Sequence, residues 1–490
     1  MRLTPNKIVI KGKKCSTEAK NMLTDLKTRK TRRKMFDFVN KYIIGTSLPI
    51  LLMAAGVFYL IILKGKPLKT PLRMIKSMLA PNENDKDGIS PFRSVTMALA
   101  GTLGVGNIVG VASAIALGGF GAIFWMWVSA LVAMILKYAE ITLAVSHRRK
   151  RKNEKLESEN YGGAMYYIRD YFDHSGKQKL GVALAAVFAI FCVIDAVSMG
   201  CVVQVNAVSS AFHGVLDVPT WIVGAVLTLM TALVVTKGTK GISALTEYLV
   251  PLMSLGYIIM SAAVMIICRD RLPEAMGQIF KSAFSVGSTA GGVLGFLVSD
   301  ALRFGTMRGL LSNEAGCGTA PFAHAASNTD QPAKQGVWGI FEVFVDTIIL
   351  CTMTALVIIL NYDDACAYAS DGIMMTVKAY SAVVGKGAEY FLAIAVLLFA
   401  YATVICWAQY GRESVSYLFP NKKRPIGVFT VIYCASVFVG AIIAPSAIWT
   451  LADFCIGSIT IINVIIICLM STEVRDLTNR YFYKNKAAQK

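Results

Sequence analysis

Long apolar runs alternate with short polar connections along most of this chain. Eleven runs are long enough to cross a bilayer, since about 20 apolar residues span its hydrocarbon core. They cover residues 42–63, 92–117, 121–146, 180–212, 219–236, 243–268, 285–308, 336–360, 386–418, 427–444 and 446–470. The pattern predicts an all-α polytopic membrane protein with about 11 transmembrane helices.

The second run is unusual for a plain anchor because glycines crowd its centre. Gly101, Gly104, Gly106 and Gly110 lie there together with Asn107. Each glycine costs about 1 kcal/mol of helix propensity relative to alanine, and an unsatisfied backbone group in hydrocarbon costs several kcal/mol more. A broken helix is expected only where protein or water covers it, so the break is a candidate binding site. For this run taken alone, close helix packing through small residues is the alternative.

A second glycine-rich segment, SVGSTAGGVLGF at residues 285–296, opens the second half of the chain. The ten runs after the first divide into two sets of five, within residues 90–268 and 285–470. Because five is odd, the two sets insert with opposite orientation. Interrupted helices at corresponding positions of two inverted repeats, here the first and sixth core helices, are typical of a secondary transporter.

The distribution of charge predicts how the helices are oriented in the membrane. The formal net charge of +19 is compatible with a nucleic-acid partner, but the lysines and arginines lie in the tails and in every second connection, which the positive-inside rule explains. The broken helix then runs from the cytoplasm outward, and residues 471–490 form a cytoplasmic tail. Residues 1–41 form a basic tail, 42–63 an extra helix and 64–89 an amphipathic linker. An odd number of spans places the basic N-terminal tail outside, against the same rule.

Polar residues inside the runs are the next candidates, because burying them in lipid is costly and they usually face the bundle interior. Asp195, Gln204 and Asn206 lie on the third core helix. For Gln204, a substrate contact and a helix–helix hydrogen bond both remain open. Thr403 and Trp407 lie one turn apart on the eighth core helix, so a hydroxyl ligand and an aromatic wall would share one face.

Other polar residues and motifs point away from enzyme chemistry. We expect structural or near-interface roles for Glu140 with Lys137, for Asp346 and for Asp453. The sequence has no His-x-x-x-His pair, no Gly-x-Ser-x-Gly elbow and no Walker-type loop. The 11 cysteines form no Cys-x-x-Cys pair, so neither a metal site nor a disulfide framework is expected. No cofactor is predicted, and uphill transport would use an ion gradient.

Two segments resemble the signatures of the alanine or glycine:cation symporter family, also called the sodium:alanine symporter family. The first begins GVGNIVGVA at Gly104 and continues to Glu140. The second is RGLLSNEAGCGTAP at residues 308–321, followed by Ala323 to Ala326, and is expected after the sixth core helix. The similarity runs from about Ser90 to about Val474.

This resemblance implies a leucine-transporter-type fold with sodium-driven amino acid uptake. It places the substrate carboxylate against the broken first helix near Gly104, Gly106 and Asn107, where helix-end N–H groups suit an anion. It implies further substrate contacts at Gln204, Gly292, Gly295, Phe296 and Trp407, with Gly291 also in the sixth-helix break. It implies sodium bound by the carbonyls of Ala100 and Leu103 and by the hydroxyl of Thr403.

Several positions depart from the family pattern. Val105 and Ala402 stand where threonines are expected, and Phe120 stands where the family has proline. The segment VLGFL at residues 293–297 replaces a pattern closer to Phe-Ala-Gly-Ala-Thr, and Ile456 and Ile462 replace asparagine and proline. A lost hydroxyl would weaken sodium binding, and Phe296 would reshape selectivity.

The leading hypothesis is a sodium-coupled symporter of a small neutral amino acid, of the alanine or glycine type, working by alternating access in the cell membrane. The alternatives are a non-transporting sensor or scaffold on the same fold, and a symporter with altered substrate or proton coupling. The expected partners are the amino acid, sodium and the lipid bilayer, with no nucleic acid; the sequence does not define an oligomeric state.

Overall fold

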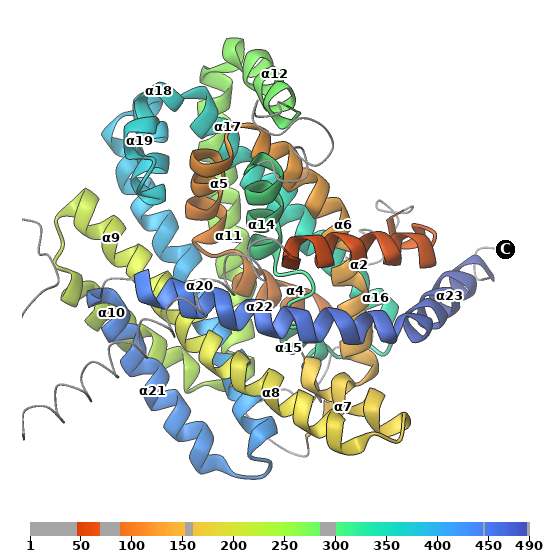
Figure 1. Ribbon diagram of the computed structural model, residues 1–490. Coiled ribbons are helices and arrows are strands. Elements are labelled where there is room, and N and C mark those ends of the chain that lie inside the picture. Colours follow the sequence, from red (N-terminus) through yellow and green to blue (C-terminus); the bar gives the residue numbers. More distant parts are fainter. Residues whose placement is uncertain (1–46, 69–88, 152–159, 285–299, 444–445, 488–490) are drawn as a thin grey trace, which may run out of the picture.

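Helices build almost all of the described chain. The computed structural model describes residues 47–68, 89–151, 160–284, 300–443 and 446–487, and within them the only strands are the hairpin partners β1 (Arg149–Lys150) and β2 (Asn160–Tyr161). The first half contains α2 (Leu48–Ile62), η2 (Lys66–Leu68), α4 (Pro91–Thr102), η3 (Gly106–Gly110), α5 (Val111–Gly118), α6 (Gly121–Ser146), α7 (Ala164–His174), α8 (Gln178–Val197), η4 (Ser198–Val203), α9 (Gln204–Leu216), α10 (Thr220–Val235) and α11 (Gly238–Ile267). In Figure 1, α4, α5, α6 and α11 lie toward the middle of the molecule, and α7, α8, α9 and α10 lie toward its lower and left edges.

The second half continues the bundle with helices of very different lengths. It contains η5 (Arg269–Arg271), α12 (Leu272–Ala283), α14 (Asp300–Asn313), α15 (Ala320–Ala325), α16 (Pro332–Val343), η6 (Phe344–Cys351), α17 (Thr352–Leu360), α18 (Tyr362–Ala365), η7 (Cys366–Tyr368), α19 (Gly372–Val384), α20 (Lys386–Leu418), α21 (Lys423–Ile442), α22 (Ser446–Leu469) and α23 (Ser471–Ala487). This confirms an all-α polytopic architecture.

The number of spans is compatible with the predicted eleven. In the described residues, 7 helices are long and apolar enough to cross a membrane, or 8 if the bent pair of α4 with η3 and α5 is one span. Shorter apolar helices, α2 and α10, occupy the first and fifth predicted runs. The remaining run, 285–308, lies partly outside the described residues and continues into α14.

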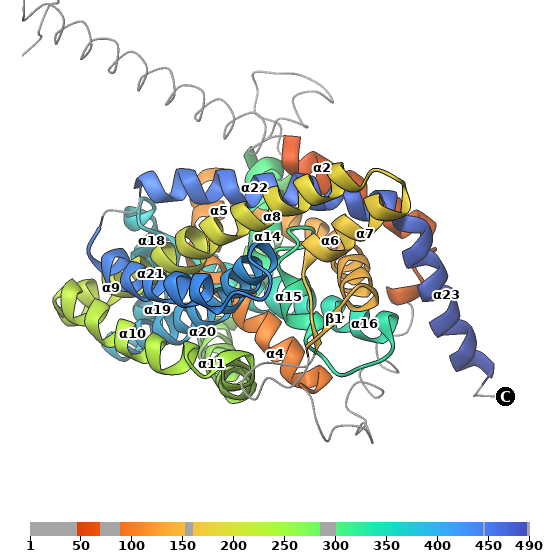
Figure 2. The same ribbon diagram turned by 90° about the horizontal axis from the view of Figure 1, so that it is seen from below.

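The sequence did not predict three short helices in the connections between spans, because none of them is an apolar run of bilayer length. The connection after α11 forms α12, and the connection after α17 forms α18 and the apolar 13-residue helix α19. Figure 1 shows α12, α18 and α19 together at the upper end of the molecule, near α5. The hairpin and α7 lie toward the opposite end (Figures 1 and 2).

The orientation of the two halves agrees with the predicted inversion. Along the chain, α4 leads upward to α5 in Figure 1, whereas α14 follows α12 at the upper end and leads down toward α15. The first core helix and the described part of the sixth therefore run in opposite directions.

Small residues bring α6 against α14 and α16. A Cβ built on Gly305 would lie 2.1 Å from the carbonyl oxygen of Ala122, and one on Gly309 would lie 2.6 Å from Ser129 Oγ. A Cβ on Gly339 would likewise lie 2.4 Å from Ile141 Cδ1. Only glycine permits these backbones to approach so closely.

The C-terminal segment is a helix anchored to the bundle. Glu473, near the start of α23, accepts a hydrogen bond from His147 Nε2 at 3.0 Å, and Asp170 on α7 faces His147 Nδ1 at 2.8 Å. Burial alone would lower the pKa of His147, but these two carboxylates outweigh it and raise the pKa to about 9. Most of the predicted tail, residues 471–487, is therefore the helix α23, whose start is bound to the bundle through Glu473. The basic tail at 1–41 and most of the 64–89 linker lie outside the described residues.

Candidate functional site

The predicted break in the first core helix is present. α4 ends at Thr102, η3 begins at Gly106, and the two helical parts meet at an angle of 52°. Ser90 caps the start of α4 by accepting a hydrogen bond from the N–H of Arg93 at 3.1 Å. Residues 103–105 lie between the two parts, so their backbone groups are free to bond outside the helix.

The first freed group is the carbonyl of Ala100. In a continuous helix it would accept from the N–H of Gly104, but that N–H bonds instead to the carbonyl of Thr102 at 2.9 Å. The hydroxyl of Thr403 on α20 donates to Ala100 O at 3.0 Å. Among the hydrogen bonds of the described residues, none ends at the carbonyl of Leu103. Of the three residues implied as sodium ligands, Ala100 and Thr403 are thus in direct contact, and Leu103 lies in the break itself.

The second freed group is the N–H of Val105, which donates to Oε1 of Gln204 at 3.0 Å. Gln204 is buried at the start of α9, directly after the irregular turn η4, and its Nε2 donates to Met199 O at 3.3 Å. Of the two roles left open for Gln204, the structure shows a hydrogen bond between helices, made to the break itself.

Gly104 joins these two contacts. A Cβ built on it would lie 2.8 Å from Gln204 Oε1 and also 2.8 Å from Thr403 Oγ1. Three residues chosen from the sequence thus converge on one point: Gly104 in the break, Gln204 on α9 and Thr403 on α20. By contrast, no described residue lies within 4 Å of a Cβ built on Gly106 or Gly110, so the backbone next to this point borders space free of described atoms.

Asn107 points to a different group of buried polar residues, which we call the Asn107 cluster: Asn107, Ser312, Asp346, Thr347 and Cys351. Asn107 Nδ2 donates to Asp346 Oδ1 at 2.6 Å, and the hydroxyls of Ser312 and Thr347 donate to Asp346 Oδ2 at 3.1 and 2.7 Å. Asn107 Oδ1 is buried and has no hydrogen-bond partner among the described residues. A carboxylate and an unpartnered amide oxygen are hard oxygen donors of the kind that small cations prefer.

Asp346 was not chosen as a site residue from the sequence. It lies in η6, a π-helical segment that joins α16 to α17, and is fully buried. A single aspartate in an apolar run gives no sign that its partner lies 239 positions earlier. The signal that the sequence did carry is a carboxylate inside a run long enough to span the membrane.

Trp407 lies one turn after Thr403 on α20, as predicted, and is fully buried. Its ring packs 5.4 Å from that of Tyr410, and a Cβ built on Gly200 would lie 2.3 Å from Trp407 Cγ. Gly292, Gly295 and Phe296 lie outside the described residues, so their place at the site stays a prediction.

A second buried polar group lies between α6, α14, α15 and α16, and we call it the Lys137 cluster: Lys137, Asn313, His324, Gln335 and Glu342. Lys137 Nζ lies 3.0 Å from Glu342 Oε1 and donates to Asn313 O at 2.7 Å. His324 Nε2 lies 3.2 Å from Glu342 Oε2, and Gln335 Nε2 lies 2.9 Å from His324 Nδ1. The sequence suggested that Lys137 pairs with Glu140. In the structure its salt bridge is instead with Glu342.

Glu140 instead holds the second signature segment. Its carboxylate accepts from the N–H groups of Gly316 and Gly318 at 2.7 and 2.9 Å. Both glycines have positive φ, +80° and +82°, which explains why the turn after α14 requires glycine. The signature was expected after the sixth core helix, but its first residues, from Arg308 to Asn313, form the last turns of α14.

Asn206 and Asp195 differ in their contacts. Asn206 Nδ2 donates to the carbonyls of Ile443 and Gly440 at 2.8 and 3.3 Å and so binds the end of α21. Asp195 is buried at the end of α8, with Ser198 Oγ at 3.4 Å.

The chain has several bilayer-length helices, and one span is broken at its centre, where freed backbone groups meet polar side chains. Together these features define a multi-pass membrane transporter. The chain belongs to the sodium:alanine symporter family, whose model matches residues 29–490. Membership confirms the predicted class, a sodium-coupled amino acid symporter of the cell membrane and not an enzyme.

Relatives cover nearly the whole chain. The sodium/alanine symporter AgcS of Methanococcus maripaludis is 34% identical over 92% of this chain and 97% of its own length. The probable sodium/glutamine symporter GlnT of Bacillus subtilis is 34% identical over 90% of this chain and 88% of its own. Among solved structures, that of MhsT in complex with L-phenylalanine aligns with a TM-score of 0.47 and 15% identity, covering 79% of this chain and 90% of that chain.

Proposed function

We propose that this protein carries a small neutral amino acid, of the alanine or glycine type, together with sodium. The observation that carries the proposal is the convergence of Gly104, Gln204 and Thr403 at the break, beside Gly106, where no described residue lies within 4 Å of a Cβ. A similar relative is described as a sodium/alanine symporter, whereas another is described as a probable sodium/glutamine symporter. The small-substrate assignment therefore depends on the site and not on the family alone.

In this proposal the break supplies binding groups for both the substrate and the sodium ion. The substrate carboxylate lies against the N–H groups that begin η3, near Gly104, Gly106 and Asn107, where the positive end of the helix dipole favours an anion. Sodium lies between the carbonyls of Ala100 and Leu103 and the hydroxyl of Thr403. Neutral oxygen donors suit a monovalent cation that must also be released.

The transport cycle follows from the position of these groups. Ala100 belongs to the first repeat and Thr403 to the second, so an ion bound by both favours the state in which the repeats are close together. Substrate and sodium would bind from outside, the repeats would rock against each other, and both would be released inside.

A proton-coupled symporter is the second candidate, and the Asn107 cluster favours it. The carboxylate of Asp346 is buried and lies 2.6 Å from the side-chain amide of Asn107, just after the break. A buried carboxylate on the transport path can carry a proton.

Uptake into proteoliposomes tests both proposals. Full-length protein would be supplied with labelled alanine, glycine or glutamine under an inward sodium gradient, an inward proton gradient or neither. We expect sodium-stimulated uptake of alanine or glycine, lost in Asn107→Leu and Thr403→Val. Thr430→Val is the matched control, because the Thr430 hydroxyl bonds only within its own helix, to Ile426 O.

The alternative results are distinct. Uptake driven by the proton gradient alone would favour the second candidate, and preference for glutamine would overturn the small-substrate assignment. Saturable binding without uptake or counterflow would identify a non-transporting sensor or scaffold. Uptake unchanged in both site variants would place the site elsewhere.

A further inference from the structure

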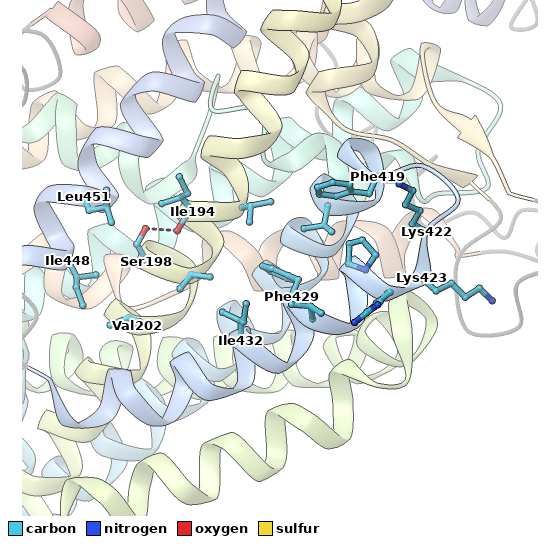
Figure 3. A pocket seen from close by; sticks show the side chains of 16 residues that line it. Ile194, Ser198, Val202, Phe419, Lys422, Lys423, Phe429, Ile432, Ile448 and Leu451 are labelled. Atoms are coloured by element: carbon cyan, nitrogen blue, oxygen red, sulfur yellow. Dashed lines mark hydrogen bonds between the residues drawn. The ribbon is translucent and has the colours of Figure 1, made fainter.

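An apolar groove lies on the bundle away from the break, between the end of α8 with η4, the end of α20, the start of α21 and the start of α22. Its volume is about 1010 Å³, at the upper end of the ~300–1,000 Å³ of small-molecule sites. Figure 3 shows Lys422 and Lys423 at one end and Val202, Ile448 and Leu451 toward the other.

The wall of this groove is suited to hydrocarbon. Apart from the basic end, its lining side chains are apolar with one exception, Ser198, whose hydroxyl already donates to Ile194 O at 3.0 Å (Figure 3). Val428 and Ile432 are 51% and 52% exposed, so the groove opens to the outside of the protein. An amino acid or a hydrated ion would find no polar partner along this wall.

The groove is also elongated. Val193 to Val202 on one wall and Lys423 to Ile432 on the other each span nine residue steps, which corresponds to about 14 Å at 1.5 Å per residue. This length matches a long alkyl segment lying along the helices.

The basic end carries three consecutive cations, Lys422, Lys423 and Arg424. All three are exposed, and within the described part of the chain none of them has an acidic partner. They lie at the end of the bundle that carries the hairpin, since Arg151, next to β1, lies 2.5 Å from Glu413 near the end of α20. The positive-inside rule places this end in the cytoplasm.

We propose that this groove binds an anionic phospholipid of the inner leaflet, with an acyl chain along the apolar wall and the phosphate at Lys422, Lys423 and Arg424. Basic pockets between helices on the cytoplasmic side recognise lipid headgroups in this way. Charge also argues against the chain's own N-terminal tail as the occupant, because residues 1–41 are strongly basic and would be repelled by the three cations.

The site joins α8 and η4 to α21 and α22. Gly200 in η4 packs on Trp407, and Gln204 follows η4 and bonds the break. A lipid in the groove therefore contacts the element that positions Gln204, which gives it a route to influence the transport site.

Native mass spectrometry of the full-length protein in detergent tests the proposal. The probes are phosphatidylglycerol, phosphatidylcholine and inorganic phosphate. We expect one tightly bound phosphatidylglycerol, weaker phosphatidylcholine, and no displacement by phosphate. Lys422→Gln/Lys423→Gln/Arg424→Gln should weaken binding of phosphatidylglycerol about 100-fold, at about fivefold per cation.

The matched control is Lys237→Gln/Lys240→Gln, which removes exposed cations from another basic connection and should leave the affinity unchanged. Phosphatidylglycerol with a photoreactive acyl chain should label peptides containing residues 193–202 and 428–432. Ile432→Trp, which fills the groove at an exposed position, should abolish that labelling while keeping all three cations.

The outcomes separate the proposal from simpler explanations. Equal affinity for the two lipids, or equal loss in both charge variants, would reduce the effect to general attraction to an anionic surface and overturn the site. Displacement by phosphate, or labelling elsewhere, would overturn the acyl-chain groove. Melting curves without lipid establish that each variant is folded, so loss of binding in a folded triple variant supports the site.

Discussion

The two buried polar clusters differ in how completely their atoms are paired. In the Lys137 cluster, the lysine, histidine, glutamine and glutamate side chains all have partners, across four helices. In the Asn107 cluster, Asn107 Oδ1 has no partner within the described residues, and the cluster borders the break. Buried polar atoms are normally satisfied, so the complete cluster holds the fold together and the incomplete one is suited to receive a cation.

The largest expected effect breaks the complete cluster. Lys137→Met leaves Glu342 buried without its cation, which should lower the free energy of unfolding by about 3–5 kcal/mol. Thermal melting of the detergent-solubilised protein, followed by size-exclusion chromatography, measures this loss. Lys137→Met/Glu342→Gln should recover part of it. If the single variant melts like the parent and only transport falls, the contrast between the clusters is wrong.

Asp346→Asn changes the incomplete cluster. It removes the charge but keeps the size and one oxygen, so we expect a melting temperature close to the parent and at least a tenfold loss of sodium-stimulated uptake, as for removing a charge-assisted contact of about 1.5–3 kcal/mol. Proteoliposome uptake and melting are measured on the same preparation. A large fall in melting temperature with unchanged uptake per folded molecule would assign the Asn107 cluster to stability.

Alanine substitutions at two glycines of the break test whether the space around its backbone matters for sodium binding. In Gly104→Ala the new methyl group would lie 2.8 Å from both Gln204 Oε1 and Thr403 Oγ1, so the sodium concentration for half-maximal uptake should rise about 5- to 100-fold, as for overpacking that costs about 1–3 kcal/mol. Gly106→Ala is the comparison variant. No described residue lies within 4 Å of its Cβ, so the sodium concentration for half-maximal uptake should stay near that of the parent, while the alanine concentration for half-maximal uptake rises because Gly106 borders the proposed substrate carboxylate. Equal effects of both would mean that backbone freedom, and not space, matters there.

The smallest effect concerns a polar cluster at the surface, His147 with Asp170 and Glu473. The pKa of His147 is raised to about 9. The stability that protonated His147 gives to the docking of α23 is therefore fully present below its ordinary pKa of 6.5 and is lost as the pH rises through 9. Burial raises the pKa of both carboxylates, but His147 outweighs it and lowers the pKa, together with Arg149 at Asp170 and Ser146 at Glu473. The stability that these carboxylates contribute is therefore lost only in acid. The protection factors of the α23 amides, which correct hydrogen exchange for its intrinsic base catalysis, should therefore fall above about pH 9 in the parent. They should be low and independent of pH in His147→Gln, and parallel profiles would contradict the role of His147.

The glycines predicted the break itself, because a helix rich in glycine is easily interrupted and must find external partners for its backbone. The resemblance to the family implied Thr403 beside the first-helix carbonyls and Gln204 at the substrate, and the structure shows both side chains bonded to the break. The sequence did not reveal Asp346, because the contact with Asn107 depends on packing between distant helices. It also missed α19, because a 13-residue apolar helix is too short to be recognised as a span and was read as part of a polar connection.

The glycine contacts along α6 have a mechanical meaning. Where the carbonyl of Ala122 would lie 2.1 Å from a Cβ at Gly305, the two backbones interlock too closely for one helix to slide past the other without steric collision. Farther along α6, Gly309 and Gly339 leave room for the side chains of Ser129 and Ile141 in the same way. These contacts hold α6 firmly against α14 and α16. In the proposed transport cycle, the displacement falls instead at the hydrogen bonds around Val105 and Ala100, where single bonds can exchange for contacts with an ion.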